Sequence, residues 1–147
     1  MNKYKYNLSL DVLRNILIFC IGGLLYFIVE IIYRGHSHYT MIILGGLCFL
    51  VIGLLNENIF TWEMSIPSQM LFSSIIITLL ELLFGIILNL WLELDIWDYS
   101  REPYNLFGQI CLLYSVFWHW LSLIAILLDD WLRHKLFGEN YKEYVLL

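Results

Sequence analysis

The apolar run Met70–Leu92 constrains the fold more than any other segment of the chain. It is long enough to cross a bilayer, because a helix needs about 20 mostly apolar residues to span the hydrocarbon core. Glu81 is the only ionisable residue within it. A carboxylate at that depth costs at least ~2.5 kcal/mol unless it faces a partner or a water-filled cavity, or carries a proton. We therefore expect a membrane protein with a polar group inside the bilayer that serves a function.

The composition supports this class and excludes others. Hydrophobic residues make up 61% of the chain and charged residues 14%, whereas a soluble domain carries about 25% charged residues. The net charge of −5 leaves no basic surface for phosphates, so nucleic acid is excluded as a partner. Cys20, Cys48 and Cys111 lie in apolar runs and fit no metal-binding spacing. Because the nucleotide-binding motif GxxxxGK[ST] is also absent from the sequence, we expect no metal and no cofactor.

Four apolar runs predict an all-α fold, an integral membrane bundle of four transmembrane helices within a single domain, residues 1–147. Residues 129–147 mix apolar and charged side chains. They are expected to form either a short C-terminal interfacial helix that ends near Gly138 or a frayed cytoplasmic end. The predicted spans are residues 12–33, 39–60, 67–92 and 106–128.

The positive charges predict the orientation in the cell membrane. Six of the eight Lys and Arg residues lie in the two terminal segments. The loop between the second and third spans has none, and the other two loops carry Arg34 and Arg101. Because Lys and Arg are enriched on the cytoplasmic side, both termini are expected to be cytoplasmic.

Each predicted span has one face of small and polar residues. At about 100° of rotation per residue, the small and polar residues of the third span fall within roughly 80° of one another around the helix axis. Such faces are expected to point into the bundle, with the apolar faces toward lipid. Close helix packing explains Gly, Ser and Thr, whereas an ionisable residue such as Glu81 indicates a functional site. The face in the third span consists of Ser74, Thr78, Glu81, Gly85 and Asn89.

His119 is the predicted partner of Glu81. Counted at 1.5 Å per residue, Glu81 lies about 16 Å and His119 about 17–20 Å from the outer ends of their helices. Both residues lie on polar faces, so we expect them to approach each other directly or through water. The alternative is a neutral core histidine bonded to a backbone carbonyl or to Ser115.

The first polar cluster at the outer face is Glu30-x-x-x-Arg34-Gly35-His36-Ser37-His38. In one interpretation, Arg34 binds an anion or a lipid headgroup, and His36 and His38 add donors. In a second, His36 and His38 bind a metal with an acidic ligand, although they match no known zinc spacing. In a third, the segment is an interfacial turn in which Arg34 neutralises Glu30.

The second cluster lies in residues 97–108 (WDYSREPYNLFG). Asp98 and Ser100 favour turns, and Asn105 is expected to cap the fourth helix. The density of turn and aromatic residues, Tyr99 included, predicts an ordered binding loop or lid. The alternative is a cap that merely satisfies two helix ends. By orientation both clusters share the outer face, so they could close one pocket above Glu81.

The segments RGHSHYTMIILGGLCF, NEN and WDYSREPYNLFGQICLLYSVFW resemble a group of bacterial membrane proteins, the putative ABC-transporter permeases of the CmpB type, which are related to a small eukaryotic transmembrane family. The match is concentrated in residues 30–57 and 93–118. The resemblance implies a polytopic protein with four or more helices and no established catalytic roles. The residues that match positions of the family motif are Arg34, Asp98, Tyr99, Ser100, Pro103, Asn105 and Gly108.

Three functions remain open. The first is a permease-like component for transport or lipid handling, in which Glu81 is proton-linked or faces the substrate. The second is an intramembrane enzyme in which Glu81 and His119 act as acid and base on a lipid-like substrate held by Arg34. The third is an accessory protein without chemistry. The expected partners are membrane lipid and a membrane protein or a second copy. The candidate site residues are Glu30, Arg34, His36, His38, Glu81, Asn89, Asp98, Tyr99, Ser100, Asn105 and His119.

Overall fold

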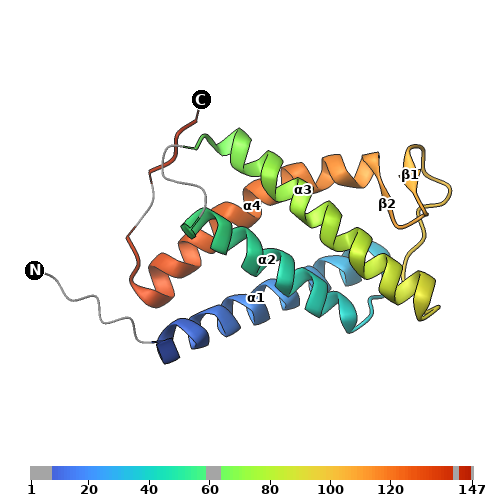
Figure 1. Ribbon diagram of the computed structural model, residues 1–147. Helices are drawn as coiled ribbons and strands as arrows, with labels where there is room; N and C mark the ends of the chain where they lie inside the picture. Colours follow the sequence, from blue (N-terminus) through green and yellow to red (C-terminus); the bar gives the residue numbers. More distant parts are fainter. Residues whose placement is uncertain (1–7, 59–63, 141–142, 147) are drawn as a thin grey trace, which may run out of the picture.

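The computed structural model describes residues 8–58, 64–140 and 143–146 (Figure 1). These residues form four α-helices, one π-helix and a small β-hairpin, so the predicted all-helical class is confirmed. The elements are α1 (Leu8–Arg34), α2 (Thr40–Asn58), α3 (Ile66–Gly85), η1 (Ile86–Trp91), β1 (Asn105–Leu106), β2 (Ile110–Cys111) and α4 (Leu112–Phe137).

The helix ends follow local chemistry. Pro67 lies in the first turn of α3, where its missing N–H removes no hydrogen bond. Gly35 and Gly138 follow α1 and α4 with φ angles of 75° and 69°, a left-handed conformation that glycine adopts without steric cost. The predicted stop at Gly138 is confirmed.

Three helical segments are long and apolar enough to cross a membrane, which supports the predicted membrane class. They are Leu10–Arg34, Ile66–Trp91 and Leu112–Phe137. The apolar part of α2, Thr40–Leu55, is shorter. Residues 59–60 of the predicted second span lie outside the described residues.

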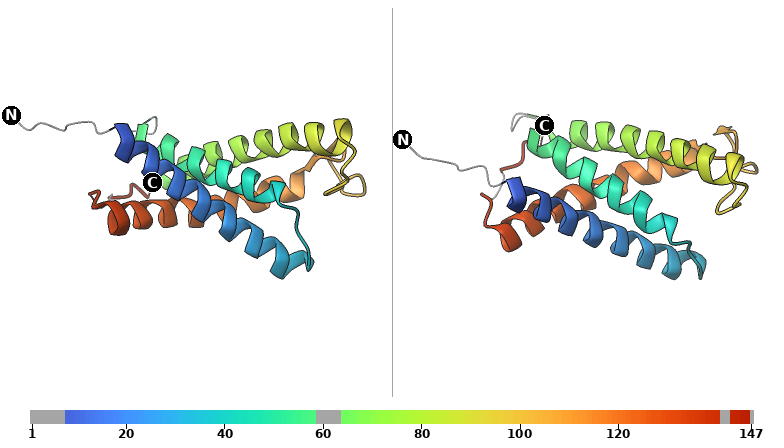
Figure 2. Two further views of the ribbon diagram at one scale, coloured as in Figure 1. Left: turned by 90° about the horizontal axis from the view of Figure 1, so that it is seen from below. Right: turned by 60° about the horizontal axis from the view of Figure 1, so that its bottom comes forward.

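The helices pack as two pairs, α1 with α2 and α3 with α4 (Figure 2). Glycines allow the backbones of the first pair to approach closely. A Cβ atom on Gly23 would lie 2.3 Å from the carbonyl oxygen of Ile42, and one on Gly46 would lie 2.6 Å from that of Phe19. Larger side chains at these positions would therefore push α1 and α2 apart.

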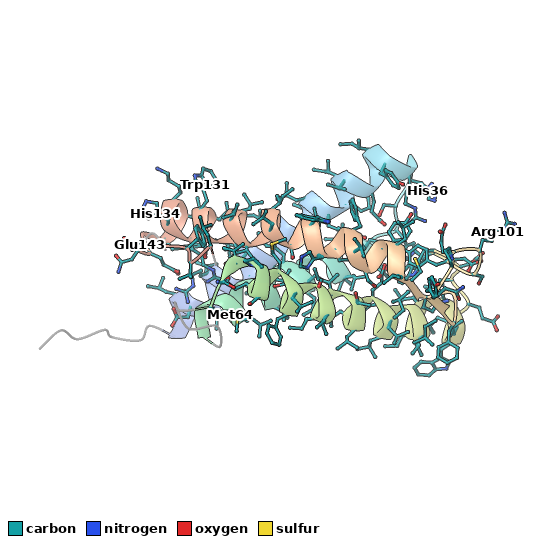
Figure 3. The ribbon with its side chains drawn as sticks, turned by 90° about the horizontal axis from the view of Figure 1, so that it is seen from above. His36, Met64, Arg101, Trp131, His134 and Glu143 are labelled. Atoms are coloured by element: carbon teal, nitrogen blue, oxygen red, sulfur yellow. The ribbon has the colours of Figure 1, made fainter. Side chains whose placement is uncertain are left out.

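The bundle has two distinct ends. We call the end where α1 begins and α4 finishes the terminal end, and the opposite end, with residues 35–39 and 92–111, the loop end. Figure 3 shows His36 and Arg101 at the loop end, and Met64, Trp131, His134 and Glu143 at the terminal end. Toward the loop end, α1 diverges from α4 (Figures 2 and 3).

The predicted start of the fourth span is wrong. Helix α4 begins at Leu112, because the preceding residues form the hairpin in which Asn105 pairs with Cys111 and Leu106 with Ile110. Asn105 does not cap the helix. Cys111 holds the N-cap position and makes no side-chain cap.

The predicted separate C-terminal helix is not formed, and residues 129–137 are not a frayed end. Helix α4 runs unbroken to Phe137. Asp129 and Arg133, one turn apart, are buried and form an ion pair of 2.7 Å. The backbone N–H of Ile66 donates to the carbonyl of Val145 at 2.9 Å, so the described part of the tail packs on the start of α3. The charged face that suggested an interfacial helix therefore points into the protein.

Candidate functional site

Glu81 lies on α3 with 4% of its surface exposed. Its two carboxyl oxygens each accept a hydrogen bond. The indole Nε1 of Trp118, on α4, donates to Oε2 at 2.8 Å. The hydroxyl of Tyr99, from the segment that connects η1 to the hairpin, donates to Oε1 at 3.0 Å. The costly carboxyl group identified in the sequence is therefore buried and satisfied by two donors from distant segments.

The predicted direct contact between Glu81 and His119 is not formed. No hydrogen bond joins their side chains in the described part of the chain. His119 is half-buried, and its ring meets Trp120 edge-on with 5.7 Å between the centroids. Neighbouring helical residues point about 100° apart. Because Trp118 takes the direction toward Glu81, His119 is turned aside.

A cavity of about 270 Å³ lies beside Glu81, between all four helices. Glu81 is its only carboxyl group among the described residues. The other lining side chains are apolar except for Tyr26, Cys48 and Ser122. The interior is therefore much less polar than the stripes on the four spans predicted.

The polar face of α3 instead joins α3 to α4. The hydroxyl of Thr78 donates to that of Ser115 at 3.2 Å. The Ser122 hydroxyl lies 2.7 Å from the carbonyl oxygen of His119 on its own helix and 3.3 Å from that of Met70 on α3. These contacts confirm that the face points inward, and they show that most of it serves helix packing.

Asn89 holds the segment after η1 in place. Its Nδ2 donates to the carbonyl of Trp97 at 2.9 Å and to Oε1 of Gln109 at 2.8 Å, and its Oδ1 accepts from the N–H of Ile96 at 2.8 Å. Gln109, 4% exposed, also accepts at its carbonyl from the indole of Trp97. Gln109 was not among the residues predicted from the sequence, although an amide in an otherwise apolar stretch was a visible signal.

Glu30 and Arg34 form the predicted i,i+4 pair at 3.1 Å. Glu30 also accepts from the hydroxyl of Ser37 at 2.6 Å. Nη2 of Arg34 donates to the carbonyl of Ile96 at 2.8 Å. Arg34 therefore neutralises Glu30, as the third interpretation expects, and the turn is tied to the segment that carries Tyr99.

The two histidines of this turn do not converge. Nδ1 of His36 lies 3.0 Å from the carbonyl oxygen of Arg34, and the side chain is exposed (Figure 3). Nδ1 of His38 lies 2.8 Å from Oγ1 of Thr40. Among the described residues, no group of three His, Cys, Asp or Glu side chains is placed to hold a metal ion.

Of the candidates in the second cluster, Tyr99 reaches Glu81, whereas the others shape the turn. Asp98 accepts from the N–H and the hydroxyl of Ser100, and these hydrogen bonds hold the pKa of Asp98 below its usual value. Asn105 donates to the carbonyl of Glu102 at 2.8 Å and accepts from the N–H of Gly108 at 3.1 Å.

Burial and the nearby Glu81 carboxyl raise the pKa of Tyr99 well above its usual value, so its hydroxyl keeps its proton and donates. Its ring stacks on Tyr114 of α4 with 4.5 Å between the centroids. The predicted lid therefore has a specific contact with the site.

The family model described as Putative ABC-transporter type IV, of the CmpB type, matches residues 17–145. The chain belongs to this family. The matched region of this family member contains Glu81, Tyr99 and Trp118 and all four helices in large part. No curated protein and no solved structure matches the chain.

Proposed function

We propose that this family member is a permease-like component of the cell membrane, acting in transport or lipid handling, with a ligand site at Glu81. One observation carries the proposal: a buried carboxyl group lines a cavity between four helices and is bonded to a loop residue, Tyr99. An ionisable group within a membrane span indicates function by default.

The proposal includes four membrane spans. The apolar part of helix α2, Thr40–Leu55, has 16 residues, which corresponds to about 24 Å at 1.5 Å per residue. This is roughly 6 Å less than the ~30 Å thickness of a hydrocarbon core. Helix α2 also packs against α1, α3 and α4, so it shares their depth in the bundle. A slightly short span among longer neighbours is accommodated at small cost.

The same proposal places both termini in the cytoplasm, following the distribution of Lys and Arg. The loop end then faces outward, and the site is proposed to open there. Tyr99 covers Glu81 from that side. When the loop lifts, Oε1 of Glu81 loses its donor and becomes available to a ligand or a proton. Four lone pairs on a carboxylate leave room for such an exchange.

The intramembrane enzyme is less well supported. It required Glu81 and His119 to act together, and the described residues do not bring them into contact. An accessory role without ligand binding is retained as an outcome of the experiment below.

The test is transbilayer movement of a lipid in reconstituted vesicles, followed with a headgroup-labelled phospholipid and a quencher that does not cross the membrane. The wild-type protein should accelerate the movement relative to protein-free vesicles. Glu81→Gln keeps the size of the side chain and should lower the rate at least about tenfold, which corresponds to about 1.4 kcal/mol.

Glu102→Gln is the matched control, because its carboxyl group lies in the loop and belongs to neither the cavity lining nor the contacts of Glu81. It should leave the rate unchanged. A wild-type rate equal to that of empty vesicles, or full activity of Glu81→Gln, would overturn the proposal and favour the accessory role.

A further inference from the structure

We propose that the cavity binds one hydrocarbon chain of a bilayer lipid, which enters sideways between α1 and α4. This inference rests on the proposed function and names the class of ligand. It follows from the contacts between the helices, the exposure of the lining residues and the chemistry of the lining.

Buried contacts join the helices at the terminal end of the cavity. Ile18, Phe49 and Leu132, all buried, form a hydrophobic cluster there that joins α1, α2 and α4. Beyond this cluster, Arg14 of α1 donates to Glu139 at 2.7 Å, just after α4. These contacts hold α1 against α4 at this end.

An aromatic pair forms part of the cavity wall. The rings of Tyr26 and Trp118 lie 6.0 Å apart, so they connect α1 to α4 where they line the cavity. Trp118 is further fixed by its hydrogen bond to Glu81. The exposed fractions of the other lining residues therefore indicate where the cavity opens.

The side between α1 and α4 provides that entry. Leu25 and Val29 of α1 and Ile124 of α4 line the cavity, and they are also 41%, 46% and 61% exposed. A residue that lines a cavity and reaches the surface marks its rim. The helices that carry these residues diverge toward the loop end (Figures 2 and 3).

The position of the rim selects the ligand. Ile124 lies near the middle of α4, so in the bilayer the opening faces the hydrocarbon core, where the surrounding molecules are lipid chains. Apolar cavities are not filled by water and bind apolar molecules instead. A hydrocarbon chain therefore matches both the lining and the environment of the opening.

The length and volume of the cavity agree with a single hydrocarbon chain. The lining extends along α4 from Trp118 to Leu128, about 15 Å at 1.5 Å per residue. A volume of about 270 Å³ lies just below the ~300–1,000 Å³ of typical small-molecule sites. Glu81 lies toward the loop end of this slot, so the polar part of the lipid is expected toward the loop end and the chain toward the terminal end.

The experiment uses the full-length protein in vesicles that contain a phosphatidylcholine with a photoreactive group near the end of one acyl chain. After illumination, labelled residues are mapped by mass spectrometry. We expect label on cavity residues such as Leu121 and Leu128, above the level on lipid-facing residues such as Leu127. Uniform labelling of all lipid-facing positions would overturn the inference.

Ala125→Phe is the decisive variant, because Ala125 lines the cavity and a phenyl group would fill it. Labelling of the cavity residues should fall at least about fivefold. Leu127→Phe is the control on the same helix, since Leu127 is 41% exposed and lies outside the lining. If Ala125→Phe is poorly produced, Leu121→Trp should narrow the cavity from the same helix and lower the labelling likewise. Unchanged labelling in a folded cavity-filling variant would overturn the inference.

The two proposals fail separately. Cavity labelling without any lipid movement by the wild-type protein would overturn the proposed function, but it would still support binding of a hydrocarbon chain in the cavity. Lipid movement that depends on Glu81, without selective labelling of the cavity, would overturn only the inference that the cavity binds a hydrocarbon chain.

Discussion

Tyr99 and Glu81, separated by 18 positions in the chain, are joined by a hydrogen bond of 3.0 Å between the phenol hydroxyl and Oε1. The bond connects a loop at one end of the bundle to a carboxyl group deep between the helices. The same loop is held to α1 by Arg34, through the carbonyl of Ile96. Hydrogen bonds therefore connect the loop both to the turn between α1 and α2 and to the buried carboxyl group of Glu81.

Tyr99→Phe should destabilise the loop and the protein, because it leaves Oε1 of Glu81 without its donor. The expected loss is about 1–3 kcal/mol in the free energy of unfolding, measured by denaturation in detergent micelles. Proteolysis within residues 93–104 should also become faster. Tyr104→Phe is the control, since Tyr104 is 83% exposed. Equal stability of the two variants would show that the hydrogen bond contributes little.

Gly108→Ala should be more harmful than Gly35→Ala, although both glycines have positive φ angles, 67° and 75°. Left-handed backbone costs a non-glycine residue about 1–2 kcal/mol, and both variants share this strain. At Gly108 a Cβ atom would also lie 2.4 Å from the Ser100 hydroxyl, whereas at Gly35 it would meet nothing within 4 Å. Thermal unfolding in the same detergent should rank the variants in this order. A reversed order would contradict the turn geometry.

Arg133→Met should cost about 3–5 kcal/mol, because it removes one partner of a buried ion pair and leaves Asp129 charged in the interior. Arg14→Met is the comparison. Its side chain is 29% exposed and pairs with Asp11 and Glu139 near the surface, so a loss of at most about 1 kcal/mol is expected. The yield of folded protein and the midpoint of unfolding provide the measurement.

The turn at Asp98 should loosen in acid. Hydrogen bonds from the hydroxyl and the N–H of Ser100 lower the pKa of Asp98 in the folded protein. The turn's contribution to stability is therefore complete above the unfolded pKa of about 3.9. It declines as the pH falls below that value and is lost below the folded pKa. Hydrogen exchange of the Ser100 amide should show this change, and Asp98→Asn should abolish its pH dependence.

The sequence predicted the helical class and the approximate spans because hydrophobic length is a local property. Positions 67–92 and the stop at Gly138 agree with the structure for this reason. The hairpin at residues 105–111 was missed, since Asn105 was assigned as a helix cap. The inward face of Asp129 and Arg133 was also missed, because their spacing is equally compatible with a charged surface.

The site could be predicted only in part. The burial of Glu81 and the ordered loop followed from the cost of a carboxyl group in hydrocarbon and from the turn residues around Asp98. The partner of Glu81 did not, because depth alone cannot distinguish His119 from its neighbour Trp118. That choice depends on the rotation of α4 about its axis, which tertiary packing sets.

The π-helix η1 has a consequence for the length of this segment. Its hydrogen bonds reach back five residues, as from the N–H of Leu92 to the carbonyl of Ile87, so each hydrogen-bonded loop contains one residue more than in an α-helix. The extra residue helps to aim Asn89 at Trp97 and Gln109. Removing one apolar residue from Ile86–Leu88 would leave a span of adequate hydrophobic length but rotate Asn89 away from them. Chain length in this stretch is therefore under tighter constraint than its composition.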